Sequence, residues 1–213
     1  ATLYLANEDL ESLRGNIKTI LDTWAKKGWE PQHLTYQHLF ALRGRIYLYL
    51  YEGRNADTWE EHERRWPSIN AGQWHRHAFT RILNIELRGR CALSVAASNP
   101  TAMKEAQTCA VLLQKEELPW GVAMGQLIKA TCLHLEGEKE EPIQLMQEAL
   151  RTFDRKELGL YAAVTRYRLG QLLKGAEART HRVGAEGWMY NQNIKNPARL
   201  ADVFAPGFEK AID

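Results

Sequence analysis

Residues 133–153, LHLEGEKEEPIQLMQEALRTF, contain the pattern that decides the fold. The stretch begins with Leu133 and Leu135, reaches a turn-forming residue at Gly137, and continues with apolar residues three or four positions apart, namely Ile143, Met146, Ala149, Leu150 and Phe153. This spacing places side chains on one face of an α-helix, and glycine is common just after a helix ends. The stretch therefore predicts the end of one helix, a tight turn and a second, amphipathic helix.

The same layout recurs along the chain. Turn-forming residues between an apolar stretch and an amphipathic segment lie at Asn7, Gly53, Ser98, Gly137 and Gly175, at separations of 46, 45, 39 and 38 residues. Repeats of this length are typical of stacked helix pairs. One hairpin of helices cannot cover its own apolar face, so each hairpin should contact mainly the hairpins beside it. We expect an all-α fold of four to five stacked hairpins that form a curved superhelix.

Periodicity and helix breakers together predict ten helices and no sheet. Residues 46–51 would also suit a strand, but they lie in a longer segment without a hairpin turn and are assigned to a helix. Every proline lies where a helix should begin or end; Asn99-Pro100 and Asn196-Pro197 each pair an N-cap with proline at the first helical position. We assign residues 1–213 to one domain, with helices near 7–27, 31–52, 55–66, 71–97, 100–116, 119–136, 140–155, 157–174, 176–192 and 197–204.

Composition narrows the classes of function. The chain has 28 Lys and Arg against 26 Asp and Glu and no basic block, so we expect no nucleic-acid partner. A membrane-spanning helix needs about 20 apolar residues, and no such run is present. Residues 1–6 contain neither an initiator methionine nor a secretory signal, so we expect a fragment of a longer chain. Three widely spaced cysteines, Cys91, Cys109 and Cys132, are typical of reduced core thiols and favour a cytoplasmic location.

The turns resemble those of tetratricopeptide repeats, although the period exceeds the roughly 34 residues of that family and its consensus residues are not reproduced. Trp188-Met189, residues 193–201 (NIKNPARLA) and residues 204–208 (FAPGF) are similar to the closing segment of long bacterial serine/threonine kinases and related multidomain regulators. The C-terminal halves of those proteins are tetratricopeptide-like arrays. The resemblance implies a divergent, right-handed superhelix that follows a kinase domain. This chain has no His-Arg-Asp, Asp-Phe-Gly or Gly-x-Gly, so we expect no kinase activity in it.

Other candidate chemical groups favour structural roles. His75 and His77 would point about 200° apart on a helix and could not chelate a metal together. The cysteines lie in apolar patterns and the serines in no Gly-x-Ser-x-Gly motif, so we expect no catalytic residue, metal or cofactor. Gly121 and Gly125 predict close helix packing. The seven tryptophans are interpreted as aromatic plugs between hairpins: Trp24, Trp29, Trp59, Trp66, Trp74, Trp120 and Trp188.

One polar stripe predicts a partner-binding groove. At 100° per residue, four polar residues of the expected helix 71–97 fall within about 60° of each other: His77, Arg81, Asn84 and Arg88. By resemblance to tetratricopeptide arrays, this helix would line the concave side, near Arg43 and Tyr47 of the expected helix 31–52. Arginine can bind a carboxylate through two hydrogen bonds, which suits an acidic peptide or a free C-terminus. A solvated helix face is the alternative interpretation of the stripe.

Two hypotheses of function follow from these residues. The first is a non-catalytic protein–protein interaction or regulatory module, which binds a peptide or a partner domain, including another domain of its parent chain. The second is an all-α small-ligand sensor or enzyme with a pocket between hairpins, which a cavity ringed by converging polar groups would favour. A self-association surface is a third possibility.

Overall fold

The computed structural model describes residues 1–208, which form eleven α-helices, two short 3₁₀ helices and no strand. The expectation of an all-α fold is therefore confirmed. The α-helices are α1 (Thr2–Ala6), α2 (Leu10–Thr23), α3 (Tyr36–Tyr51), α4 (Asn55–Ala71), α5 (Ala78–Leu93), α6 (Pro100–Gln114), α7 (Pro119–Leu135), α8 (Glu140–Arg155), α9 (Gly159–Leu172), α10 (Gly175–Asn191) and α11 (Pro197–Phe204), and the 3₁₀ helices are η1 (Pro31–His33) and η2 (Gln73–Arg76).

Helix ends follow the local chemistry of the sequence. The side chain of Asn99 accepts hydrogen bonds from the first turn of α6, and that of Asn196 accepts one from the first turn of α11, as the Asn-Pro pairs predict. Gly53, Gly137 and Gly175 have φ angles of 73°, 94° and 67°, which side chains with a Cβ rarely adopt. Three of the five expected turns are therefore fixed by glycine.

The expected helix 7–27 spans only Leu10–Thr23, and the expected helix 31–52 begins only at Tyr36, after the short helix η1. The largest boundary errors lie near residue 70. The expected helix 55–66 continues to Ala71 and contains Pro67, so this proline does not end a helix. The last turn of α4 is held by packing, because Ile69 is buried. The expected helix 71–97 begins only at Ala78, after the short helix η2. Residues 46–51 are helical, as assigned from the sequence.

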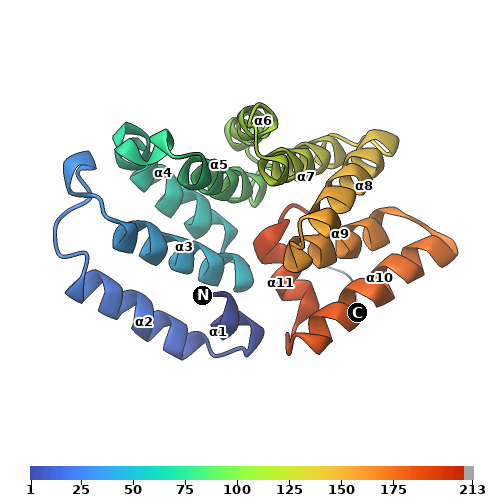
Figure 1. Ribbon diagram of the computed structural model, residues 1–213, viewed down its shortest axis with the longest axis horizontal. Coiled ribbons are helices and arrows are strands. Elements are labelled where there is room, and N and C mark those ends of the chain that lie inside the picture. Colours follow the sequence, from blue (N-terminus) through green and yellow to red (C-terminus); the bar gives the residue numbers. More distant parts are fainter. Residues whose placement is uncertain (209–213) are drawn as a thin grey trace.

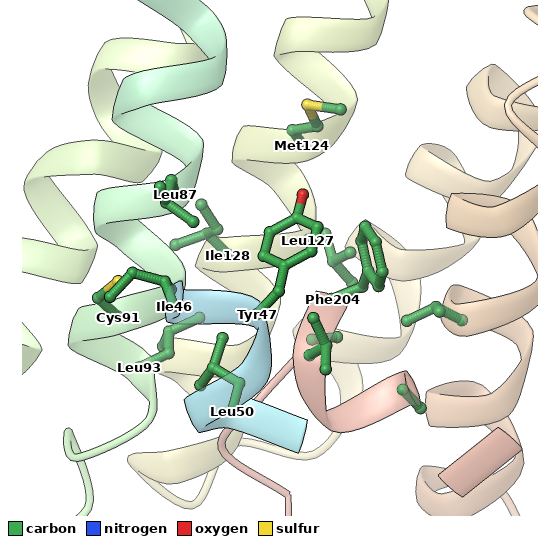
Figure 2. Close-up of a cluster of buried hydrophobic side chains, with 14 of the residues drawn as sticks. Ile46, Tyr47, Leu50, Leu87, Cys91, Leu93, Met124, Leu127, Ile128 and Phe204 are labelled. Carbon is green, nitrogen blue, oxygen red and sulfur yellow. The ribbon is translucent and has the colours of Figure 1, made fainter. Parts of the chain in front are cut away.

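Consecutive helices pack against each other along an arc (Figure 1). α11 lies in the space that the arc encloses and contacts both α3 and α9. We call the side of α3, α5, α7 and α9 that faces this space the inner surface. Figure 2 shows part of it, with Phe204 of α11 beside Tyr47 of α3.

The stack is not a simple single file of hairpins, which corrects the expectation of contacts mainly between neighbours. After α10 the chain turns back, and the backbone N–H of Lys195 donates to the carbonyl oxygen of Ala6 over 2.9 Å. The physical reason is burial, since α11 could not cover its own apolar side. The α11 residues that become buried on the inner surface are Leu200, Ala201, Val203 and Phe204.

The remaining sequence predictions about packing are mostly confirmed. A Cβ atom on Gly121 would lie 2.9 Å from the Ile82 side chain, and one on Gly125 would lie 2.9 Å from the Ala110 carbonyl oxygen, so both glycines permit close helix contact. Six tryptophans pack against the core, whereas Trp24 is 66% exposed and plugs no gap. Within residues 1–208, no helix is both long enough and apolar enough to span a membrane.

Candidate functional site

The centre of the inner surface contains a buried ion pair between two residues of α5. Arg90 and Glu86 are 1% and 2% exposed, and the Nε atom of Arg90 lies 2.7 Å from Oε1 of Glu86. Nη2 of Arg90 donates to the other carboxylate oxygen over 2.9 Å and to the Tyr47 hydroxyl over 3.1 Å. The Tyr161 hydroxyl of α9 donates to Glu86 over 3.0 Å. A buried ion pair is tolerated only when such further hydrogen bonds satisfy its polar atoms.

The surroundings fix the protonation state of this network. Burial opposes the charge of Arg90 most strongly, but Glu86, Tyr47 and Tyr161 together outweigh burial and raise the pKa of the guanidinium. Burial would raise the pKa of Tyr47, yet the charges of Arg90 and Arg43 outweigh burial and lower it. Burial and the negative charge of Glu86 raise the pKa of Tyr161 well above its usual value. Arg90 therefore stays charged, and Tyr161 keeps the proton that it donates to Glu86.

Two buried arginines hold the C-terminal segment on the inner surface. Nη1 of Arg90 donates to the carbonyl oxygen of Val203 over 2.9 Å. Nε of Arg168, on α9, donates to the carbonyl oxygen of Ala205 over 2.9 Å, and its Nη2 atom lies 2.6 Å from Oδ1 of Asp202. Both arginines thus bind backbone carbonyls where α11 ends and its carbonyls lack helical partners. The inner surface is built to hold a short helix.

An aromatic side chain anchors α11 between these arginines. The Phe204 ring lies 5.3 Å from the Tyr47 ring and 5.4 Å from the Tyr161 ring, both in edge-to-face geometry. The guanidinium of Arg90 lies 5.0 Å from the centre of the same ring. Such contacts add to the free energy gained by burying the ring itself.

The predicted groove residues fall into two groups. Arg43 and Tyr47 lie on the inner surface, where Arg43 donates to the Tyr47 hydroxyl over 3.1 Å and to the carbonyl oxygen of Leu83. Tyr47 is 6% exposed and is covered by Phe204. These two residues of α3 lie next to each other, and α11 covers Tyr47.

The stripe on α5 faces away from the inner surface. Arg88 lies between α4 and α6, paired with Glu63 over 2.8 Å and with Glu105. Both Nε and Nη2 of Arg81 donate over 2.6 Å to the carboxylate of Glu116, in the turn before α7. Asn84 is buried, and His77 is exposed at the N-cap of α5. The register of α5 explains this placement, because Glu86 and Arg90 occupy the face opposite the stripe.

Sequence reasoning missed Glu86, Arg90 and Arg168. Each lies in a mostly apolar helical segment, such as residues 82–93 (ILNIELRGRCAL). A charged residue in such a segment must find a partner when the helix is buried, so the pattern alone could have marked these positions.

Part of the inner surface is not covered by α11. The N-terminal turns of α3 and α5 carry Phe40 and Phe79, both 62% exposed, on the same helix faces as Tyr47 and Glu86. Tyr36 is 47% exposed, one turn before Phe40, and its ring stacks on that of Phe40 at 6.2 Å. The Phe79 ring lies 6.0 Å from that of Trp120, at the start of α7. We call Tyr36, Phe40, Phe79 and Trp120 the aromatic face.

A polar cleft of about 550 Å³ lies at the other end of the inner helices, where α3 and α9 approach α10 and α11. Its walls include Tyr51 at the end of α3, Gly53 in the turn that follows, and Tyr190 from α10. Its charged side chains come mainly from α9, α10 and the start of α11. Volumes of about 300 to 1,000 Å³ are typical of small-molecule sites.

The described part of the chain contains no cluster of metal-binding side chains, and its cysteines are buried. Residues 1–208 contain no group of three or more His, Cys, Asp or Glu side chains that could hold a metal ion. The three cysteines are free thiols and buried, as expected from the sequence. Burial raises the pKa of Cys91 and of Cys132 to about 12, so the thiolate is disfavoured at both.

Comparison of the chain with protein-family models, with curated proteins and with solved structures gave no match.

Proposed function

We propose that this chain is a non-catalytic protein–protein interaction module, in which a tetratricopeptide-like stack of hairpins binds a partner peptide or helix on its inner surface. The observation that carries the proposal is the aromatic face, where Phe40 and Phe79 are 62% exposed beside the surface that α11 occupies. Large exposed apolar groups that cluster on one surface are typical of interaction sites, and aromatic residues often dominate binding energy there.

The chemistry of the inner surface indicates what kind of segment it would bind. It already holds α11 through one aromatic anchor and through arginine bonds to backbone carbonyls. A partner on the aromatic face would insert apolar side chains at helical spacing. We place partner binding here and not at Arg81 and Arg88, because glutamates already occupy both guanidinium groups.

The proposal also covers the protein to which the module belongs. The similarity of residues 193–208 to the end of bacterial serine/threonine kinases suggests a regulatory region that acts on its parent protein in the cytoplasm. Reading the gene upstream of Ala1 tests this part. A glycine-rich loop and a catalytic loop of a kinase there would support it, and a different domain would contradict it.

A peptide selection tests the binding surface directly. Displayed random peptides are selected on the wild-type protein, and the dissociation constants of the enriched peptides are measured for wild type and for Phe40→Ser/Phe79→Ser. We expect the double substitution to weaken binding by at least about tenfold, since aromatic hot spots contribute about 2 kcal/mol or more.

The matched control is Val111→Ser/Leu112→Ser. These two apolar residues are 52% and 44% exposed on α6, which is not part of the inner surface. The control should bind the peptides like wild type. If the enriched peptides bind Phe40→Ser/Phe79→Ser as tightly as wild type, the aromatic face is not the binding site.

A further inference from the structure

The polar cleft between α3, α9, α10 and α11 has an uneven balance of charge. Seven charged side chains line it. Four are cationic and three are anionic: Arg168, Arg182, Lys195 and Arg199, and Glu52, Glu186 and Asp202. Which of the cations remain available to a ligand depends on the ion pairs that these side chains form.

Each carboxylate of the cleft has a cationic partner. Asp202 pairs with Arg168 over 2.6 Å, and Glu186 pairs with Arg182 over 3.1 Å. Glu52 pairs with Arg14 and lies 3.7 Å from Arg54, two residues that do not line the cleft. The negative charges of the cleft are therefore compensated without Lys195 or Arg199.

The other two cations of the cleft, Lys195 and Arg199, form no ion pair in the described part of the chain. Nζ of Lys195 donates to the carbonyl oxygen of Asn7 over 3.0 Å, and the guanidinium of Arg199 lies 5.7 Å from the centre of the Tyr51 ring. Within residues 1–208, neither cation has a carboxylate within 4 Å. Both are exposed and both line the cleft, four residues apart in the chain.

We propose that this cleft binds a small organic anion through a carboxylate or phosphate group held by Lys195 and Arg199. Arg199 would supply a planar pair of N–H donors and Lys195 a point charge, the two modes by which proteins bind these groups. The buried side of the cleft is fixed by Arg168 and Tyr167, which are 1% and 2% exposed. A preformed pocket of about 550 Å³ suits a small molecule.

Occupation of the cleft would also link α3 to the helices α9 to α11. The walls come from α3 on one side and from α9 to α11 on the other, and Lys195 already contacts Asn7 near the N-terminus. An anion bound there should therefore stabilise the folded chain as a whole.

The test titrates the full chain with citrate, inorganic phosphate or chloride at constant ionic strength. Calorimetry measures binding, and the melting temperature measures stabilisation. Citrate and phosphate distinguish a carboxylate from a phosphate ligand. We expect at least one of them to bind saturably and to raise the melting temperature, and chloride to do neither. If neither anion binds saturably, the proposal is overturned.

A charge-matched pair of variants locates the site. Lys195→Ala/Arg199→Ala removes the two uncompensated cations, and Lys174→Ala/Arg179→Ala removes two exposed cations of the neighbouring surface that do not line the cleft. The first should weaken anion binding by at least about tenfold, and the second by less than about twofold. Equal weakening by both pairs would mean general charge attraction and would also overturn the proposal. If Lys195→Ala/Arg199→Ala loses helicity, the single variant Lys195→Ala is compared with the control variant by the same binding measurement.

Discussion

Arg90 on α5 donates a hydrogen bond to the carbonyl oxygen of Val203 on α11, although 113 residues separate them in the chain. The same guanidinium neutralises Glu86 and contacts the Tyr47 hydroxyl. One buried side chain therefore links the inner surface to the segment that fills it. Its removal should affect far more than one ion pair.

Replacing Arg90 by Met should destabilise the protein strongly. The substitution leaves the buried Glu86 carboxylate with only the distant cation of Arg43, at 3.9 Å, and the Val203 carbonyl without its donor. Loss of one partner of a buried ion pair costs about 3 to 5 kcal/mol. Urea denaturation measures the free energy of unfolding. The double variant Arg90→Met/Glu86→Leu should recover part of the loss, because no unpaired charge remains buried.

A surface ion pair provides the comparison for Arg90. Arg166 pairs with Asp154 over 2.8 Å, and the two side chains are 34% and 45% exposed. Arg166→Met should cost less than about 1 kcal/mol, since water competes with an exposed ion pair. Similar losses for Arg90→Met and Arg166→Met would contradict the importance of the buried network.

Alanine substitutions at two helical glycines should have opposite effects. A Cβ atom on Gly125 would lie 2.8 Å from the Cβ of Leu113 and 2.9 Å from the Ala110 carbonyl oxygen, so Gly125→Ala should cost about 1 to 3 kcal/mol. At Gly184 no atom lies within 4 Å of the added Cβ, and Gly184→Ala should stabilise by about 0.5 to 1 kcal/mol through helix propensity. Thermal unfolding of both variants checks the signs, and a stabilised Gly125→Ala would refute the close contact.

The sequence predicts those parts of this fold that depend on neighbouring residues. Helix periodicity, the Asn99 and Asn196 caps and the glycine turns act over a few residues, and each is visible in the sequence alone. The boundary near Pro67 was missed because packing of Ile69 sustains the helix beyond the proline. Local preference was outweighed there by tertiary burial.

The functional surface was harder to predict because it depends on distant pairs. The polar stripe of α5 was recognised, but its orientation is set by Glu63, Glu105 and Glu116 on other elements. The return of α11 to the inner surface involves contacts across 37 to 113 residues, through Arg168 and Arg90. No periodic pattern encodes which of several apolar helix faces will receive the last helix.

The cysteines should be inert in the folded protein. Cys91, Cys109 and Cys132 are 0%, 1% and 2% exposed, and burial raises the pKa of all three. Only an exposed thiolate attacks a disulfide reagent, and in the folded chain these thiols are neither exposed nor readily ionised. We expect no labelling by such a reagent in native buffer and three labelled thiols per chain in denaturant. Rapid labelling of even one thiol in the native state would contradict the buried placement.

His62 should make the stability of the fold depend on pH. The ring is 1% exposed, and its Nδ1 atom lies 3.4 Å from Nη1 of Arg88. Burial, and then the positive charges of Arg88 and Arg43, lower its pKa from 6.5 to about 3. In the unfolded chain His62 takes up a proton as the pH falls below about 6.5, while in the folded chain it stays neutral down to about pH 3. The stabilisation is therefore complete above pH 6.5 and is lost as the pH falls from there toward 3.

The slope of stability against pH measures this effect. As the pH falls from about 6 to 4, His62 should lower the free energy of unfolding by up to about 1.4 kcal/mol per pH unit, and His62→Gln should remove this part of the slope. His77→Gln is the matched control, because His77 is exposed at the start of α5. Comparing slopes separates protonation from packing, since lost contacts shift the free energy equally at every pH. An unchanged slope in His62→Gln would show that His62 is protonated in the folded protein and that its burial does not hold it neutral.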